Sequence, residues 1–154
     1  MLTMKAKYAL RALCALAAAH PKRLQARQIA AAAEVPEKFL ESILVELRKS
    51  NIVASKRGAQ GGHTLARPAR QIMIGDIIRT LDGPIAPIRC ASVTAYRACT
   101  DCPEPEACAL RALMGDVRDA MSEVVDRRSL QQLMQETRRL ERKRSRAATR
   151  ESRR

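Results

Sequence analysis

Residues 25–68 hold two short helical patterns in succession and then a glycine-rich hairpin pattern, an order that few small folds accommodate. The alanine-rich stretch 25–33 predicts a short helix. Pro36 predicts the start of the next one, because a proline in the first helical turn has no N–H to leave unpaired. Four apolar residues of that next helix recur at helical spacing and predict one buried stripe: Leu40, Ile43, Leu44 and Leu47.

Two short strands are predicted directly after this helix, over residues 52–56 and 63–66, with a glycine-rich turn between them. A helix over residues 3–19 comes before the pair and ends ahead of Pro21, since proline disfavours helical conformation in the residue before it. Three helices followed by a hairpin are the order of a winged helix-turn-helix domain. We therefore expect a mainly α-helical fold with a small β-hairpin wing, whose third helix presents its polar face to the major groove of duplex DNA.

The second half of the chain predicts a long helix suited to self-association. Apolar residues recur three and four positions apart along it: Leu110, Leu113, Met114, Val117, Ala120, Met121, Val124 and Val125. Little other bulk is available to cover this stripe, because the chain has one Phe, two Tyr and no Trp. We expect a second copy of the chain to cover it, which makes the protein a homodimer.

These patterns divide the chain into four parts. Residues 1–83 form the winged helix-turn-helix domain and residues 84–109 form a cysteine-rich loop. Residues 110–140 hold the dimerisation helix and a C-terminal helix, which Ser129 begins with a capping box to Gln132. Residues 141–154 have no apolar face and are expected to be a disordered basic tail.

The charge of the chain favours a polyanionic partner. The formal net charge is +13; from Arg127 onward 11 basic and 3 acidic residues give +8, which leaves +5 for the rest. Three aromatic residues offer no stacking platform for single strands, so double-stranded DNA is the expected partner. Phosphate contacts are expected from Arg48, Lys49, Lys56 and Arg57, and His63 is either a further phosphate contact or an ordinary exposed turn residue.

Other classes of protein receive little support. No run is long and apolar enough for a membrane span, so we expect a cytoplasmic protein with no membrane partner. The chain has no glycine-rich cofactor loop and no nucleophile or acid–base constellation, so we expect neither an enzyme nor a small-molecule substrate. Two alternatives stay open: a small iron–sulfur or thiol oxidoreductase, and a structural nucleic-acid binder that uses charge alone.

Four of the five cysteines lie close together, at Cys90, Cys99, Cys102 and Cys108. Clustered cysteines in the cytoplasm bind metal or carry out redox chemistry more often than they form structural disulfides. The spacing is typical of a metal-binding loop but does not select the metal, since zinc takes four thiolates as readily as an iron–sulfur cluster does. The residues alone leave zinc, a cluster and a disulfide switch of bare thiols open. Cys14 stands among apolar residues and is predicted to be a core residue.

Several segments together resemble the Rrf family of bacterial transcriptional regulators, which includes IscR, NsrR and RirA. They are KAKYALRAL, IAAAAEVPEKFLESILVELRKSNIVASKRGAQGGHTLARP, IGDIIRTLDGP and the cysteine loop, and the wing pattern RG-x-x-GG-x-x-LAR is nearly diagnostic. The resemblance covers residues 2–135 and implies a homodimeric winged-helix regulator, usually a repressor. In many members an iron–sulfur cluster, held by three cysteines before the dimerisation helix, controls DNA binding in response to iron, redox state or nitric oxide.

The resemblance also assigns individual residues. Cys90, Cys102 and Cys108 match the three family cysteines, and Arg57 matches the wing arginine. Base-reading positions of the family fall on Lys38, Phe39, Glu41 and Ser42.

This chain departs from the family pattern at the fourth ligand. Arg111 stands where IscR-type members place a histidine ligand, and Lys7 stands where NsrR-type members place an acidic one. We expect the additional Cys99 to replace them and to complete a four-thiolate cluster site. A second departure is Glu34, at a turn position that often needs glycine, where a left-handed conformation costs about 1–2 kcal/mol unless the turn is adjusted.

Overall fold

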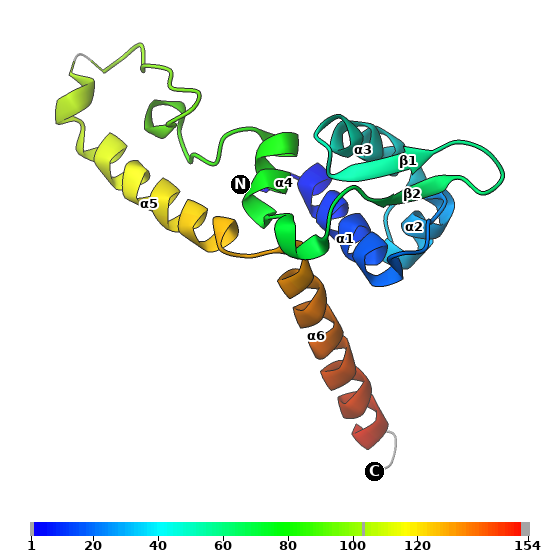
Figure 1. Ribbon diagram of the computed structural model, residues 1–154. Coiled ribbons are helices and arrows are strands. Elements are labelled where there is room, and N and C mark those ends of the chain that lie inside the picture. The colour runs from blue at the N-terminus through cyan, green and yellow to red at the C-terminus, as the bar shows by residue number, and fades with distance from the viewer. Residues whose placement is uncertain (1, 103, 152–154) are drawn as a thin grey trace.

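The computed structural model describes residues 2–102 and 104–151, with side chains described as far as Ala147 (Figure 1). Its α-helices are α1 (Met4–Ala19), α2 (Ala26–Ala33), α3 (Glu37–Lys49), α4 (Ile74–Asp82), α5 (Ala109–Asp126) and α6 (Leu130–Glu151). Strands β1 (Val53–Lys56) and β2 (Gly62–Leu65) lie between α3 and α4. Three short 3₁₀ turns complete the order: η1 (Ala69–Gln71), η2 (Arg89–Ala91) and η3 (Pro105–Ala107).

The core of the N-terminal half forms where α1, α2, α3 and the hairpin meet. The apolar stripe of α3 is buried as predicted, since Leu40, Ile43, Leu44 and Leu47 are each at most 3% exposed. They pack with Leu13 and Leu16 of α1 in one cluster. Each buried side chain of this size contributes about 1.5–3 kcal/mol to folding, and this shared core fixes the direction of α3. The predicted mainly helical fold with a two-strand hairpin is confirmed.

The turn between α2 and α3 keeps the left-handed conformation although its residue is glutamate. Glu34 has φ 51° and ψ 51°, and its N–H donates to the carbonyls of Ala30 and Ala31 at the end of α2. Its carboxylate accepts a 2.7 Å bond from Arg11 of α1. The turn is therefore not adjusted around Glu34, and the ion pair offsets part of the backbone cost.

The wing is a two-stranded antiparallel sheet in which Val53 pairs with Leu65 and Lys56 with Gly62. Backbone bonds of 3.0 and 2.8 Å between Leu24 and His63 attach its outer edge to the segment before α2. Gly62 permits this approach: it has φ 128°, and a Cβ there would lie 2.8 Å from the carbonyl oxygen of Leu24. The hairpin is thereby held at a set distance from α3.

The first turn of α6 belongs to the same core. Leu130 is 0% exposed, and its N–H donates to the carbonyl of Ile72 at 2.8 Å. Ser129 and Gln132 form the predicted capping contacts at the start of α6. The sequence pattern grouped this turn with the predicted dimerisation helix, whereas in the structure it packs on the winged domain.

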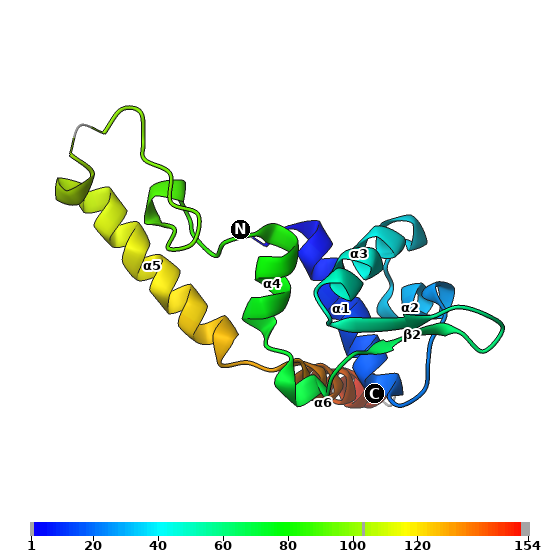
Figure 2. The same cartoon turned by 45° about the horizontal axis from the view of Figure 1, so that its top comes forward.

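Helix α5 stands away from the winged domain in both views (Figures 1 and 2). None of its residues is buried, and its apolar positions Leu110, Leu113, Met121 and Val124 are 42–62% exposed. The long helix therefore exposes its predicted apolar stripe to solvent in the single chain.

Among the helices of the described residues, none combines the length and apolar character that crossing a membrane requires.

The expected disorder beyond Leu140 is a point of difference. Helix α6 continues to Glu151, so residues 141–151 are helical, while residues 152–154 of the predicted tail lie outside the described part. Arginine, lysine, glutamate and alanine all have high helix propensity, which allows a helix to continue without an apolar face. The Arg139–Glu136 ion pair, one turn earlier, supports the same helix.

Candidate functional site

An open groove of about 650 Å³ runs between α3 and the wing. Both elements contribute charged or polar side chains to it, among them Glu41, Arg48, Lys56, Arg57 and His63. Five of the nine residues predicted to bind DNA therefore share one groove. Its position follows from the fold, because the core stripe of α3 turns the opposite face outward beside the hairpin.

The groove carries concentrated positive charge. His63 of β2 has its Nδ1 atom 2.8 Å from the Ser55 hydroxyl. Its pKa lies below the usual value, first because of burial and then because of the nearby Arg48 guanidinium. The imidazole is therefore neutral at pH 7, and two arginines and a lysine supply the positive charge of this surface.

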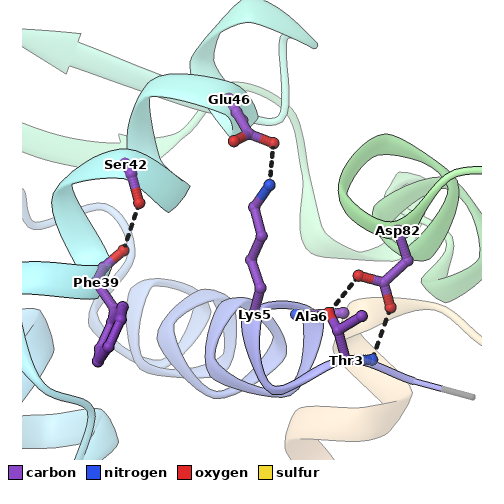
Figure 3. Close-up of polar contacts among 7 residues, drawn as sticks. All are labelled: Thr3, Lys5, Ala6, Phe39, Ser42, Glu46 and Asp82. Atoms are coloured by element: carbon purple, nitrogen blue, oxygen red, sulfur yellow. Dashed lines mark hydrogen bonds and ion pairs between the residues drawn. The ribbon is translucent and has the colours of Figure 1, made fainter.

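The exposed start of α3 lies beside the groove and holds the other predicted base-reading residues. The hydroxyl of Ser42 donates to the carbonyl of Phe39 at 2.9 Å (Figure 3). The ring of Phe39 packs toward Tyr8 with centroids 6.2 Å apart, and Lys38 Nζ lies 5.0 Å from the same ring. Phe39 thus braces α3 on α1 while it remains 48% exposed, and Lys38 is folded back over it.

An ion pair connects the last turn of α3 to the first turn of α1. Lys5 donates to Glu46 at 2.7 Å (Figure 3). At the start of α1, the N–H and hydroxyl of Thr3 both donate to Asp82 at the end of α4. The remaining predicted phosphate contact, Lys49, is exposed at the end of α3 outside the groove.

The four loop cysteines gather beside the start of α5. Cys90 lies in η2 and is 7% exposed, and Cys108 is the residue directly before α5. Cys99 is exposed, Cys102 is half-buried, and all four are free thiols. The ligand atoms of Cys99, Asp101 and Cys102 lie within 4.8 Å of one another.

Mutual contacts link the thiols. The Cys99 thiol is within hydrogen-bonding reach of Cys90 and Cys102; the Cys90 contact, burial and then the Cys102 contact raise the pKa of Cys99 to about 11. Burial raises the pKa of Cys102, which also contacts Cys108. The pKa of Cys108 is lowered, chiefly by the backbone N–H of Arg111 in the first turn of α5. The folded loop thus brings together all four cysteines that the sequence singled out.

The donor set suits a soft metal or an iron–sulfur cluster. The Cys99 thiol contacts Cys90 and Cys102, and Cys102 in turn contacts Cys108. Four neighbouring thiols match the ligands that either group takes, whereas the guanidinium of Arg111 has no lone pair to offer. Cys14, by contrast, lies in α1 against the core, and burial raises its pKa to about 11. It is a packing residue, as predicted.

Several residues that shape these sites are not apparent from sequence patterns. Gln25 lines the groove between α3 and the wing and donates to the carbonyl of Gly61 at 3.0 Å. Ser55 orients His63, and Arg118 of α5 donates to the carbonyl of Ala91 beside Cys90. Most of these contacts join residues far apart in the chain, so no local sequence pattern predicts them. Only the strand alternation that pairs Ser55 with His63 could have been read beforehand.

A winged-helix DNA-binding transcriptional regulator with a cysteine cluster is the class that this groove and loop define. A family model described as "Rrf2: Iron-dependent Transcriptional regulator" matches residues 2–136. The chain belongs to the Rrf2 family, which confirms the predicted resemblance and the expectation that the protein is a regulator and not an enzyme.

Individual relatives cover most of the chain. An rrf2-like HTH-type transcriptional regulator of Rhodobacter capsulatus is 39% identical over 138 residues, 87% of this chain and 92% of that protein. The structure of CymR, the global cysteine regulator of B. subtilis, superposes with a TM-score of 0.72 at 34% identity, over 88% of this chain and 96% of that one. T. potens IscR superposes with a TM-score of 0.69 at 28% identity, over 89% and 88% of the two chains.

Proposed function

We propose that the protein is a cytoplasmic homodimeric repressor whose binding to a palindromic operator is controlled by an iron–sulfur cluster held by Cys90, Cys99, Cys102 and Cys108. The observation that carries the proposal is the gathering of four thiols at the start of the helix whose apolar stripe is exposed. Such a cluster supplies chemistry sensitive to iron supply, redox state and nitric oxide. The chain positions it where the loop meets the dimerisation surface.

The proposed DNA contacts divide into phosphate contacts and base contacts. Arg48, Lys49, Lys56 and Arg57 bind phosphates, which makes the affinity depend steeply on salt concentration. Lys38, Glu41 and Ser42 face base edges, and Glu41 accepts from the N4 amino group of cytosine. His63 adds a phosphate contact at the wing, and Phe39 supports the helix from the side of α1.

The exposed stripe of α5 supports the dimer. Leu110, Val117 and Val124 follow one another at intervals of seven residues and are 37–62% exposed, the spacing that a pair of helices buries. Two copies joined along α5 place two recognition helices about 34 Å apart, one turn of duplex DNA. A change in the loop at the start of α5 alters their relative position.

The proposal is tested by anaerobic purification, visible absorption and analysis for iron, sulfide and zinc, followed by binding to an operator selected from random duplexes. Iron and sulfide in matched amounts, with operator affinity that changes on cluster loss, support it. Cys99→Ser tests the fourth ligand and is expected to lower cluster retention, with Cys14→Ser as the matched control. Operator binding and regulation that are unchanged in Cys102→Ser contradict the sensing proposal.

A second candidate differs only in the sensing chemistry. The contact of the Cys99 thiol with Cys90 and Cys102 also suits a disulfide switch, and the same four thiols suit zinc. Zinc without iron in the purified protein favours a structural metal site that stabilises the loop. A metal-free protein whose operator binding responds to diamide favours the thiol switch.

A further inference from the structure

The side chain of Arg111 joins three separate parts of the cysteine loop. Its Nε donates to the carbonyl of Cys90 at 3.1 Å, and its Nη1 donates to the carbonyl of Pro105 at 3.2 Å. The same guanidinium pairs with Glu106 at 2.8 Å and lies 5.5 Å from the centre of the Tyr96 ring. One residue of α5 therefore contacts the segments that carry the first and the last cysteine and the stretch between them.

Arg118 makes a parallel contact two turns further along α5. Its Nη1 donates to the carbonyl of Ala91 at 2.6 Å, while its Nη2 pairs with Asp119 at 2.7 Å. The side chains of Arg111 and Arg118 are 29% and 21% exposed, so water screens these bonds only in part. Two arginines of one helix thus bind the consecutive carbonyls of Cys90 and Ala91.

We propose that Arg111, assisted by Arg118, is a positioning residue that clamps the backbone of Cys90 to α5 and holds the four-thiol site together before any metal binds. The planar guanidinium suits this role, because its donors are fixed in a fork that reaches two carbonyls at once. Without the clamp, the loop from Cys90 to Cys108 must lose conformational entropy when a metal is bound, which weakens metal binding. At the position where the resemblance places a metal ligand, this chain carries the organiser of the ligands.

The clamp also extends the proposed function, on which this step rests. Cys90 and α5 are joined through backbone carbonyls, so a displacement of Cys90 is passed to the dimerisation helix directly. The exposed stripe of α5 begins at Leu110, next to Arg111 itself. The clamp is therefore the route from the thiols to the dimer interface.

The test uses the reduced, metal-free, full-length protein and measures alkylation of each cysteine by N-ethylmaleimide with mass spectrometry. Cys90 is 7% exposed, so we expect it to react slowly in the native protein. In Arg111→Ala we expect Cys90 to react on the order of tenfold faster, since the loss of bonds from a charged donor raises the open population by about that factor.

Internal and matched controls separate the clamp from a general loosening of the fold. Cys14 in α1 reports on the core and is expected to react at its native rate. Arg127→Ala, which removes an arginine paired with Glu123 at the far end of α5, is expected to leave Cys90 protected. Arg118→Ala is expected to accelerate Cys90 less than Arg111→Ala does.

Arg111→Lys keeps the charge but lacks the fork, and we expect it to leave Cys90 as reactive as in Arg111→Ala. It also decides the matter by itself if Arg111→Ala does not fold. Native protection of Cys90 in Arg111→Lys or Arg111→Ala, or equal acceleration of Cys14 and Cys90, overturns the proposal. The alkylation rates are measured without metal or DNA. The proposed function is tested separately, by iron content and operator binding, so the failure of one can be told from the failure of the other.

Discussion

Arg79 of α4 and Asp126, the last residue of α5, form a two-pronged ion pair. Nη1 lies 2.6 Å from Oδ1 and Nη2 lies 2.8 Å from Oδ2. Gly75 permits the approach, since a Cβ at that position would lie 1.8 Å from Asp126 Oδ1. The pair connects the winged domain to the helix proposed to carry the dimer interface.

Removing this pair is expected to have a small effect on stability that depends on Gly75. The two side chains are 37% and 43% exposed, so Asp126→Asn lowers the free energy of unfolding by no more than about 1 kcal/mol. Gly75→Ala displaces the same carboxylate, so the double variant is expected to cost less than the sum of the single ones. Chemical denaturation at equal protein concentration measures this, with Glu123→Gln as the control; strict additivity contradicts it.

The same pair has a defined pH dependence. Arg79 holds the pKa of Asp126 below its usual value, first by hydrogen bonding. The ion pair therefore contributes to the free energy of unfolding above the unfolded pKa of Asp, about 4. This contribution is lost as the pH falls through the lowered pKa of Asp126 in the folded protein. Wild type and Asp126→Asn are expected to differ in the free energy of unfolding at pH 7 and to converge as the pH falls through the lowered pKa of Asp126.

Glu34→Gly is expected to stabilise the protein. The residue has φ 51°, a conformation that costs a non-glycine residue about 1–2 kcal/mol. The exposed Arg11 pair that is lost contributes less than about 1 kcal/mol, and glycine adds unfolded-state entropy, so a net gain of up to about 1 kcal/mol is expected. Glu34→Gln keeps the strain without the charge and is expected to be slightly less stable than wild type. A destabilised Glu34→Gly shows that the turn is not strained.

Operator affinity is expected to rise as the pH falls from 8 to 6, and His63 is the cause. Its pKa is low in the free protein because of burial and Arg48. A DNA phosphate in the same groove favours the charged imidazole, so the complex takes up a proton and binding strengthens as protons become available. Fluorescence anisotropy across this range is expected to show a flatter profile for His63→Gln. His20→Gln, the other histidine, serves as the control and is expected to keep the wild-type slope.

Two leucines separate the core from the proposed dimer surface. Leu130→Ala is expected to lower the free energy of unfolding by about 2–5 kcal/mol, because the side chain is fully buried in the winged domain. Leu113→Glu, at a position that is 55% exposed, is expected to leave the winged domain folded and to weaken self-association in sedimentation experiments. Leu140→Ala, on the exposed part of α6, is the control for both. A Leu113→Glu protein that remains as dimeric as the wild type places the interface elsewhere.

Most of the secondary structure follows from local chemistry that the sequence displays. The apolar spacing of Leu40 to Leu47 set the buried face of α3, and Ser129 with Gln132 marked the start of α6. Helix α6 beyond Leu140 was mispredicted, because an absent apolar face was taken as absence of helix while the propensity of the residues favoured it. The cysteines of the candidate site could be identified from the sequence because four of the five lie within residues 90–108.

By itself the sequence determined the order of helices and strands, the face that each buries, the positive charge and the set of thiols. The helices, the strands and their buried faces depend on residues within a few turns of one another, where spacing and propensity act directly. The charge and the thiols follow from the composition alone. The tertiary structure alone decided that Leu130 completes the winged domain, that Gln25 reaches Gly61, and that Arg111 binds the carbonyl of Cys90. Those contacts depend on the packing of distant segments, and their energy is gained only after the core has brought them together.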